Sequence, residues 1–247
     1  MIVSKIDIRD DNYNEILNYI IQGFNQRSIL PFLGAGISFD KPSSLPLANT
    51  LVSPLVELMW STKDVALTST SISKPDKKLA KDILFSARLE RLLDALHKTF
   101  GNQALKYLDA LWSQQWNSNH ASLASLSQKG LLPWCVTLNF DLLIEAAANS
   151  INCSVNVLCP LTNNEIKFGN PPFKTCIIKP HGSFAGNDKS NERYSYLSAT
   201  LSQVGGAPDK RNIEMINKAI KECPVLLVAG YSDCFPSEPF GQISGLT

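Results

Sequence analysis

The sequence predicts an α/β protein built on a Rossmann-like, doubly wound parallel sheet. Short, continuous apolar runs alternate with amphipathic segments of helical period, which is typical of parallel strands joined by helices that cover both faces of a sheet. Four of these runs end in small or polar residues, as GAGIS, LNFD, KPHGS and GYS. With 247 residues, 44% of them hydrophobic and 18% charged, the chain is long enough to bury a substantial core.

The N-terminal part predicts a helix, a strand and a second helix. Apolar residues at positions 16, 17, 20, 21 and 24 recur at helical spacing and predict a helix over 12–24. SILPFL follows as a buried strand that breaks at Gly34-Ala35-Gly36, where glycines favour a tight turn. Leu45 to Trp60 then predicts a helix bent at Pro54.

A helical segment interrupts this alternation. Residues 61–76 are rich in Ser, Thr, Lys and Pro and predict a surface connection or a boundary. Three helices without an intervening strand are expected next, over 79–100, 103–116 and 120–128. We therefore expect one domain over 1–247 with a helical insertion over 62–130, so that the Rossmann-like core comprises residues 1–61 and 131–247.

The C-terminal half returns to alternating strands and helices. Apolar runs predict strands in WCVTL, CSVNVLC, KTCIIK and PVLLVAG, and helical patterns predict helices in LLIEAAAN and NIEMINKAIK. The carboxyl ends of parallel strands gather at one edge of the sheet, and open α/β sheets bind their ligands at that edge. The four strand ends named above are therefore expected to converge on one crevice.

Charge and composition exclude several classes of partner. Twenty-three Lys and Arg against 22 Asp and Glu give a net charge of +1, so neither direct nucleic-acid binding nor attraction to an anionic membrane is expected. No apolar run approaches the roughly 18 residues of a membrane span, and the acidic N-terminal stretch does not fit a signal peptide. We expect a cytoplasmic protein without membrane association.

The six cysteines predict buried thiols rather than a metal site or a disulfide framework. They stand at positions 135, 153, 159, 176, 223 and 234, and no pair has the C-x-x-C spacing of a zinc ribbon. Most of them lie in or beside apolar runs, which fits reduced cysteines in the cytosol. Neither zinc nor another metal is expected.

The residues at the strand ends each allow a structural and a chemical interpretation. Gly34 and Gly36 form a tight strand-to-helix turn, or they let a pyrophosphate approach backbone N–H groups. Asn139 and Asp141 cap the helix that follows them, or they belong to a ligand site. His181 is a hydrogen-bonded loop histidine, or it acts as a general base near neutral pH.

The other two histidines are expected to be structural. His97 lies inside an amphipathic helical pattern, which favours a surface or packing role. His120 opens the predicted helix over 120–128, which favours a cap-region or core position.

Taken together, the four strand ends resemble motifs of the sirtuin (Sir2) family, in the family's order along the chain. GAGIS matches the glycine-rich loop, LNFD is similar to the T-x-N-x-D strand end, KPHGS resembles K-x-H-G, and GYS stands where sirtuins carry G-T-S or G-Y-S. The run HASLASLSQKGLLPW is similar to the family's stretch of a histidine, two spaced leucines and a glycine. The likeness spans about residues 28–232.

Two departures from the protein deacylases of that family point to a different branch. FDKPSSLPLANTL follows GAGIS where the deacylases carry GIPDFR, and the two C-x-x-C zinc pairs are lacking. The chain is more similar to the zinc-less bacterial Sir2-like proteins of antiphage defence. These keep the NAD pocket, carry helices in place of the zinc module, and hydrolyse NAD+ to ADP-ribose and nicotinamide.

The resemblance implies roles for individual residues, with NAD+ as substrate. Asn139 would orient the ribose hydroxyls or the attacking water, and His181 would act as general base. Asp141, with the backbone at Phe140, would hold the carboxamide of nicotinamide. The phosphates and the adjacent ribose would lie on Gly34, Ala35, Gly36 and Ser38, and the adenosine half on Gly230 and Ser232.

The resemblance also leaves alternatives and implies partners. A protein deacylase is one alternative, although its peptide groove would lack the wall that a zinc lobe provides, and a non-catalytic nucleotide-binding sensor module is the other. A toxic NADase must be silent until needed, which implies a homo-oligomer or an activating partner protein or domain. Sir2-type folds place at least one more strand after GYS, whereas SDCFPSEPFGQISGLT has no strand pattern, so the sheet is expected to be trimmed at this edge or continued in a longer chain.

Overall fold

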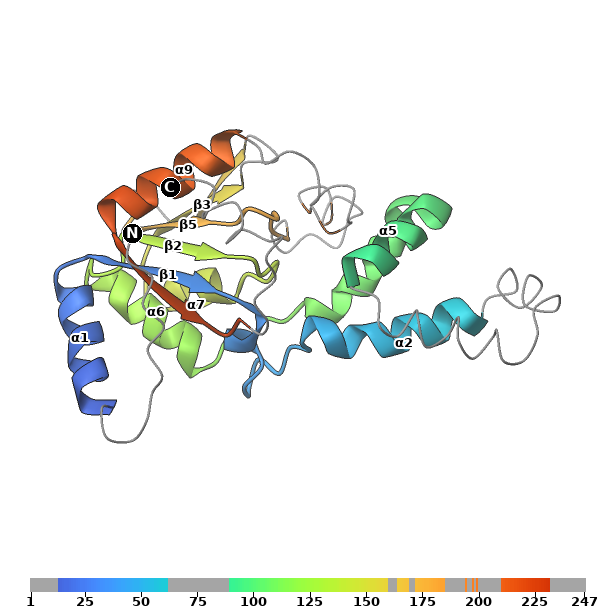
Figure 1. Cartoon of the computed structure of the whole chain (residues 1–247), viewed down its shortest axis with the longest axis horizontal. Helices are drawn as coiled ribbons and strands as arrows, with labels where there is room; N and C mark the ends of the chain where they lie inside the picture. The colour runs from blue at the N-terminus through green and yellow to red at the C-terminus, as the bar shows by residue number, and fades with distance from the viewer. Residues whose placement is uncertain are drawn as a thin grey trace.

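The computed structural model of the chain describes residues 13–61, 89–159, 164–168, 172–184, 194, 197, 199 and 210–231. These residues form an α/β structure with one sheet and helices on both of its faces (Figure 1). The predicted α/β class is confirmed, and the arrangement is compatible with a Rossmann-like fold.

The sheet has six strands in the order β4-β3-β5-β2-β1-β6. The strands are β1 (Ile29–Leu33), β2 (Trp134–Thr137), β3 (Val155–Cys159), β4 (Asn164–Phe168), β5 (Thr175–Ile178) and β6 (Val225–Ala229). Five of them run parallel, and only β4 is antiparallel to its neighbour β3. The central strands β1 and β2 are buried along their whole length, as parallel strands covered on both faces must be.

Strand β4 was not expected from the sequence. Its sequence, NEIKF, contains only two apolar residues, too few to separate an edge strand from a loop by pattern alone. Pairing with the strand beside it supplies the hydrogen bonds that define β4, and this contribution comes from tertiary structure rather than from local preference.

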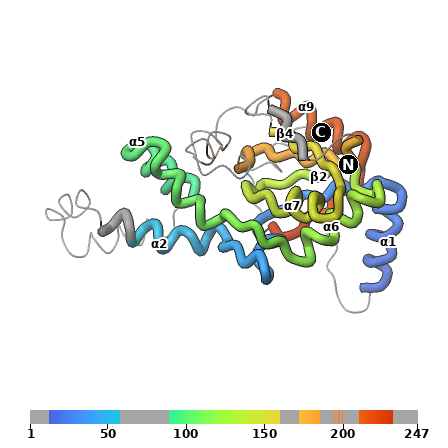
Figure 2. Tube along the Cα trace, turned by 180° about the vertical axis from the view of Figure 1, so that it is seen from behind, coloured from blue at the N-terminus to red at the C-terminus, as the bar shows by residue number. Residues whose placement is uncertain are grey.

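Helices α6 (Ser118–Gln128) and α7 (Leu143–Ser150) cover one face of the sheet, and α9 (Lys210–Glu222) covers the other. Figure 1 shows α9 above the sheet, and Figure 2, seen from behind, shows α6 and α7 side by side. Strand β3 illustrates the two layers: Val155 and Val157 pack with α6 and α7, whereas Leu158 packs with α9. Strands β1, β2, β3, β5 and β6 each contribute to two hydrophobic cores in this way.

A third core lies outside the sheet. Helix α2 (Ala48–Ser61), helix α5 (Leu89–Phe100) and the 3-10 helix η3 (Gly101–Leu111) pack together, and α2 and α5 extend side by side away from the sheet (Figures 1 and 2). The loop after β5 contributes Phe184, Tyr194 and Leu197 to this core. The helical part therefore packs directly against a loop that carries one of the predicted site motifs.

Most of the remaining elements match their predictions, with two differences, in the expected helix over 103–116 and in the packing of α6. The expected helix over 12–24 is α1 (Tyr13–Asn25), and Pro54 lies inside α2. The expected helix over 103–116 is instead the 3-10 helix η3, which ends at Leu111. The expected helix over 79–100 is described only from Leu89, as α5, and its first part lies outside the described residues. Helix α6 was grouped with the helical segment but packs on the sheet beside α7.

The cysteines that the structure describes are free thiols. Cys135, Cys153, Cys159 and Cys223 are buried and Cys176 is half-buried, whereas Cys234 lies outside the described residues. Burial raises the pKa of both Cys159 and Cys223 to about 11, so these thiols stay protonated at neutral pH. Across the described segments, every helix is too short or too polar to cross a membrane.

Candidate functional site

The candidate site lies where β1, β2, β5 and β6 reach their carboxyl ends. These strands are neighbours in the order β5-β2-β1-β6, so the turns that follow them lie at one edge of the sheet. The short 3-10 helix η2 (Ala35–Ser38) follows β1, Asn139 and Asp141 follow β2, and His181 follows β5. Sheet order thus brings together segments that are far apart in the sequence.

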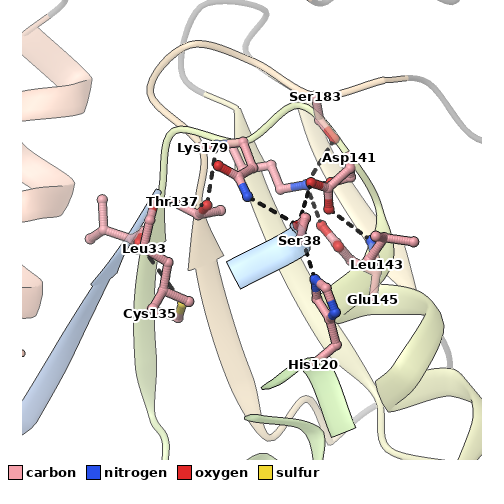
Figure 3. Close-up of polar contacts among 12 residues, drawn as sticks. Leu33, Ser38, His120, Cys135, Thr137, Asp141, Leu143, Glu145, Lys179 and Ser183 are labelled. Carbon is pink, nitrogen blue, oxygen red and sulfur yellow. Dashed lines mark hydrogen bonds and ion pairs between the residues drawn. The ribbon is translucent and has the colours of Figure 1, made fainter. Parts of the chain in front are cut away.

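The hydroxyl of Ser38 is the centre of a buried hydrogen-bond network (Figure 3). It donates to Oδ2 of Asp141 at 3.0 Å, lies 3.1 Å from Nε2 of His120, and accepts from Nδ2 of Asn139 at 3.3 Å. Ser38 is only 1% exposed. One donated and two accepted bonds use the full capacity of a hydroxyl group, so Ser38 holds its three partners in a fixed arrangement.

His120 serves both as a helix cap and as a member of this network. Its Nδ1 accepts the backbone N–H of Asn117 at 3.2 Å, and the Asn117 side chain in turn accepts the backbone N–H of His120. Since Nδ1 accepts, the proton of a neutral imidazole resides on Nε2 and is donated to Ser38. Burial lowers the pKa of His120, opposed by the charge of Asp141. The neutral form is thus favoured by both burial and hydrogen bonding.

We expect His120 to make the stability of the protein sensitive to mild acid. Its pKa is lowered from 6.5 in the folded state, so the unfolded chain takes up this proton first as the pH falls. The contribution of His120 is therefore complete above about pH 6.5 and is lost below it, with a slope of at most about 1.4 kcal/mol per pH unit. Urea unfolding between pH 7.5 and 5 should give a shallower pH dependence for His120→Asn than for the natural chain.

The half-buried His97 provides the control for this measurement. It lies on α5 and bonds Asn102, away from the network. His97→Ala should keep the pH dependence of the natural chain. Parallel curves for His120→Asn and the natural chain would contradict the assignment of a neutral, buried His120.

Asn139 is oriented by the ends of two strands. Its Nδ2 also donates to the carbonyl of Gly34 at 3.2 Å, and its backbone N–H donates to Oγ1 of Thr137 at 3.2 Å. Thr137 in turn donates to the carbonyl of Leu33 at 3.1 Å. The amide plane of Asn139 is therefore fixed by bonds to the turn after β1, which leaves its Oδ1 as the acceptor on the other side of the amide.

Asp141 combines the structural and the site interpretation that the sequence left open. Its Oδ1 accepts the backbone N–H of Leu143, the first residue of α7, at 3.1 Å, while Oδ2 accepts the Ser38 hydroxyl. The first bond satisfies the amide of the first residue of α7 from the position before its N-cap, Leu142, and the second joins the network. A carboxylate has about four acceptor positions, so these two bonds do not exhaust it.

The glycine turn after β1 packs against the end of β6. The N–H of Gly34 donates to the carbonyl of Ala229 at 3.0 Å, and the N–H of Gly36 donates to the carbonyl of Gly230 at 2.7 Å. A Cβ atom on Gly36 would lie 2.8 Å from backbone atoms of Gly230, and one on Gly34 would lie 2.6 Å from the Gly230 carbonyl. These two N–H groups, expected to meet a pyrophosphate, instead join two strand ends, and the glycines permit that close approach.

Replacing Gly36 by alanine should therefore destabilise the fold. Gly36 does not have the positive φ that disfavours alanine, so the cost is the steric overlap with the Gly230 backbone. We expect a loss of about 1–3 kcal/mol in the free energy of unfolding, measured by urea denaturation. An unchanged unfolding midpoint would show that the two turns can separate without cost.

A buried ion pair lies beneath the loops after β2 and β5. Nζ of Lys179 is 2.7 Å from Oε1 of Glu145 and also donates to the carbonyl of Asp141 and to Oγ of Ser183. Lys179 is 1% exposed and Glu145 is fully buried. Burial raises the pKa of Glu145, and the Lys179 ammonium opposes this rise.

His181 is held in the turn that follows this lysine. The N–H of Gly182 donates to the carbonyl of Lys179 at 2.9 Å, and Gly182 has a φ of +87° that favours glycine. His181 itself is half-buried. Two residues further, the N–H of Phe184 donates to the carbonyl of Phe140 at 3.0 Å, so the loops after β5 and β2 are joined by a main-chain bond.

Aromatic rings connect these two loops with the helical core of α2, α5 and η3. Phe184 packs edge-on against Phe140, Trp112 and Tyr194, with ring centroids 5.5 to 6.4 Å apart. Tyr194 also donates to Asp109 on η3 at 2.5 Å. The position of Phe140 thus depends on the helical core as well as on the sheet.

The structure brings most of the predicted site residues to one edge. Ser38, Asn139 and Asp141 are linked directly, and the turn with Gly34, Ala35 and Gly36 contacts Gly230. Phe140 and His181 lie on the two adjoining loops. Ser232 lies outside the described residues.

Sequence reasoning missed the network roles of His120, Lys179 and Glu145. Both Lys179 and His120 stand inside the motifs singled out above, KPHGS and HASLASL, but their side-chain partners lie in other segments. Glu145 had no signal, because a glutamate in the first turn of a helix is ordinarily explained by the helix dipole. Within the described ranges, no group of three or more His, Cys, Asp or Glu side chains is arranged to hold a metal.

Comparison with known proteins gives no family for this chain. Neither a scan against models of protein families nor a search of curated proteins returns a match.

Proposed function

We propose that this chain is an NAD+ glycohydrolase of the zinc-less Sir2-like type, which cleaves NAD+ to ADP-ribose and nicotinamide. The observation that carries the proposal is the direct hydrogen bonding between the GAGIS and LNFD motifs. Ser38 bonds both Asn139 and Asp141, about a hundred residues away in the chain, at the carboxyl edge where α/β sheets bind nucleotides. The GAGIS and LNFD motifs of the sirtuin resemblance thus share one polar cluster instead of forming two separate turns.

The proposed reaction replaces the bond from ribose C1′ to the nicotinamide nitrogen by a bond to water. The electron pair of the broken bond returns to the pyridinium ring, which leaves as neutral nicotinamide and needs no acid. C1′ passes through an oxocarbenium-like state, as in glycoside hydrolysis. The attacking water loses one proton, so the products are ADP-ribose, nicotinamide and H+.

The site residues divide this work. His181 would accept the proton of water or of a ribose hydroxyl, and Asn139 would orient the ribose or the water through Oδ1. Asp141 can accept the carboxamide N–H in addition to its two internal bonds, beside the backbone of Phe140. Ser38 would act indirectly, by holding the Asp141 carboxylate and the Asn139 amide.

In this proposal the phosphates of NAD+ lie against the glycine turn but do not receive hydrogen bonds from all of its N–H groups. The N–H groups of Gly34 and Gly36 already donate to the carbonyls of Ala229 and Gly230 at the end of β6, so they are not assigned to a phosphate. The turn, with Ala35, would form the floor of the phosphate subsite, and Gly230 and Ser232 would adjoin the adenosine half.

The biological setting is part of the same proposal. We place the protein in the bacterial cytoplasm as a defence NADase that depletes NAD+ on infection, with a helical insertion within residues 62–130 that excludes α6, because α6 packs on the sheet. It would be activated by assembly into a homo-oligomer or by a partner protein or domain. Within the chain, Trp112 directly after η3 packs on Phe184 and Tyr194 bonds Asp109 of η3, so the helical core contacts the loop that carries His181.

The test is release of nicotinamide from NAD+ by the purified chain, followed over a range of protein concentrations. Asn139→Ala should abolish release, while Asn149→Ala, an exposed substitution on α7, should leave it unchanged. Release that persists in Asn139→Ala would contradict the proposed site. Binding of NAD+ without release at any concentration would favour a sensor module, and release only with an acylated peptide would favour a deacylase.

A further inference from the structure

The ion pair between Lys179 and Glu145 has no role in the proposed chemistry, although it lies directly beneath the site. Both side chains are inaccessible, with Lys179 1% and Glu145 0% exposed, so neither can reach a substrate as the structure stands. Lys179 belongs to the KPHGS motif, two residues before His181.

The ammonium group of Lys179 joins three separate segments of the chain. Its three N–H donors correspond to three oxygens: the Glu145 carboxylate on α7, the Asp141 carbonyl in the loop after β2, and the Ser183 hydroxyl in the loop after β5 (Figure 3). The last two oxygens flank the residues assigned to catalysis. Asp141 carries the carboxylate that accepts from Ser38, and Ser183 follows His181 by two positions.

Stability does not explain a pair of charges at this place. Burying an ammonium and a carboxylate costs desolvation free energy, and a well-packed apolar pair of similar volume is commonly as stable or more so. An apolar pair, however, cannot donate hydrogen bonds to the Asp141 carbonyl and the Ser183 hydroxyl. The ion pair therefore adds directed hydrogen bonds from Lys179 to these two oxygens, with Glu145 as its counterion.

We propose that Lys179, charge-balanced by Glu145, is a positioning residue that holds the loop of Asn139 and Asp141 against the loop of His181. Its contribution to catalysis rests on the proposed function, whereas its effect on the two loops does not. The main-chain bond from Phe184 to Phe140 crosses between these loops close to Ser183. The amide of Phe184 therefore reports whether the loops remain together.

The test compares the natural chain with Lys179→Met/Glu145→Leu, which removes the donors without leaving a lone buried charge. Hydrogen exchange, measured without NAD+, should show the Phe184 amide exchanging at least about tenfold faster in the double variant. Amides of α6 should be unaffected. With NAD+, kcat for nicotinamide release should fall by roughly 100-fold, the cost of a small misplacement of catalytic groups, while KM changes much less.

A second pair of substitutions provides the matched control. Ser127 and Thr175 form a buried hydroxyl contact at the opposite end of β5, and Ser127→Ala/Thr175→Val also exchanges buried polar groups for apolar ones. This control should keep both the protection of Phe184 and kcat. Ser183→Ala, which removes one acceptor of Lys179 and no charge, should shift Phe184 exchange in the same direction as the double variant but less.

Unchanged Phe184 exchange in both Ser183→Ala and a folded double variant would overturn the proposal. The proposal would also be overturned if Ser127→Ala/Thr175→Val lost as much kcat as Lys179→Met/Glu145→Leu. That result would indicate a general effect of removing buried polar groups. If the natural chain releases no nicotinamide, the proposed function fails, but the exchange measurement still decides whether Lys179 positions the loops.

Discussion

Replacing His181 by alanine is expected to reduce nicotinamide release by about 10²- to 10⁴-fold, the usual contribution of a general base. The imidazole is half-buried in a turn that the Gly182-to-Lys179 hydrogen bond fixes, so it is held at the sheet edge and still reaches the surface. Removing it leaves the hydrogen-bond network of Ser38 in place. The effect should therefore fall on kcat rather than on folding.

The matched control is His97→Ala, because His97 lies on α5, outside the network of the candidate site. It should retain full activity. A variant at position 181 that keeps activity within a few-fold of the natural chain would exclude His181 as the base.

Replacing Lys179 alone by methionine is expected to cost about 3–5 kcal/mol in the free energy of unfolding. Glu145 is fully buried, so without Lys179 its carboxylate would be an uncompensated charge in the core. Replacing Glu145 as well removes the uncompensated carboxylate, so Lys179→Met/Glu145→Leu should recover most of the lost free energy of unfolding. Urea unfolding at pH 8 measures both variants.

The sign of the pH dependence provides an independent check on this prediction. Burial already raises the pKa of Glu145 above 4.5, and the ammonium of Lys179 opposes that rise. Without the ammonium the folded-state pKa rises further, so the stability cost grows as the pH increases from about 4.5 through the folded-state value. Lys179→Met should therefore be less destabilised at pH 5 than at pH 8. A loss below about 1 kcal/mol at pH 8 would show that Glu145 finds another partner or water.

Local patterns were sufficient to predict most elements of the sheet and its helices. Continuous apolar runs identified β1, β2 and β5, because strands covered on both faces need apolar residues at nearly every position. The same kind of run identified β6, although this edge strand is only half-buried and Val228 is exposed. Helical spacing likewise identified α1 and α9. The same reasoning missed β4, because an edge strand does not need apolar residues at every position. It also placed α6 in the helical segment, because periodicity shows which face of a helix is apolar but not which element packs against that face.

The sequence by itself determined which residues stand at the strand ends, and this was enough to single out Asn139, Asp141 and His181. Only the tertiary structure decided which side chains these residues bond. The bonds from Ser38 to His120 and Asp141 span 82 and 103 residues, and the strand order β5-β2-β1-β6 that makes them possible is not contained in any local pattern. Strand order also explains why Lys179 is buried against Glu145 and why the Gly34 and Gly36 N–H groups donate to carbonyls at the end of β6. Hydrophobic periodicity fixes elements one at a time, whereas a polar contact requires two elements to arrive at hydrogen-bonding distance, and that depends on how the whole sheet is assembled.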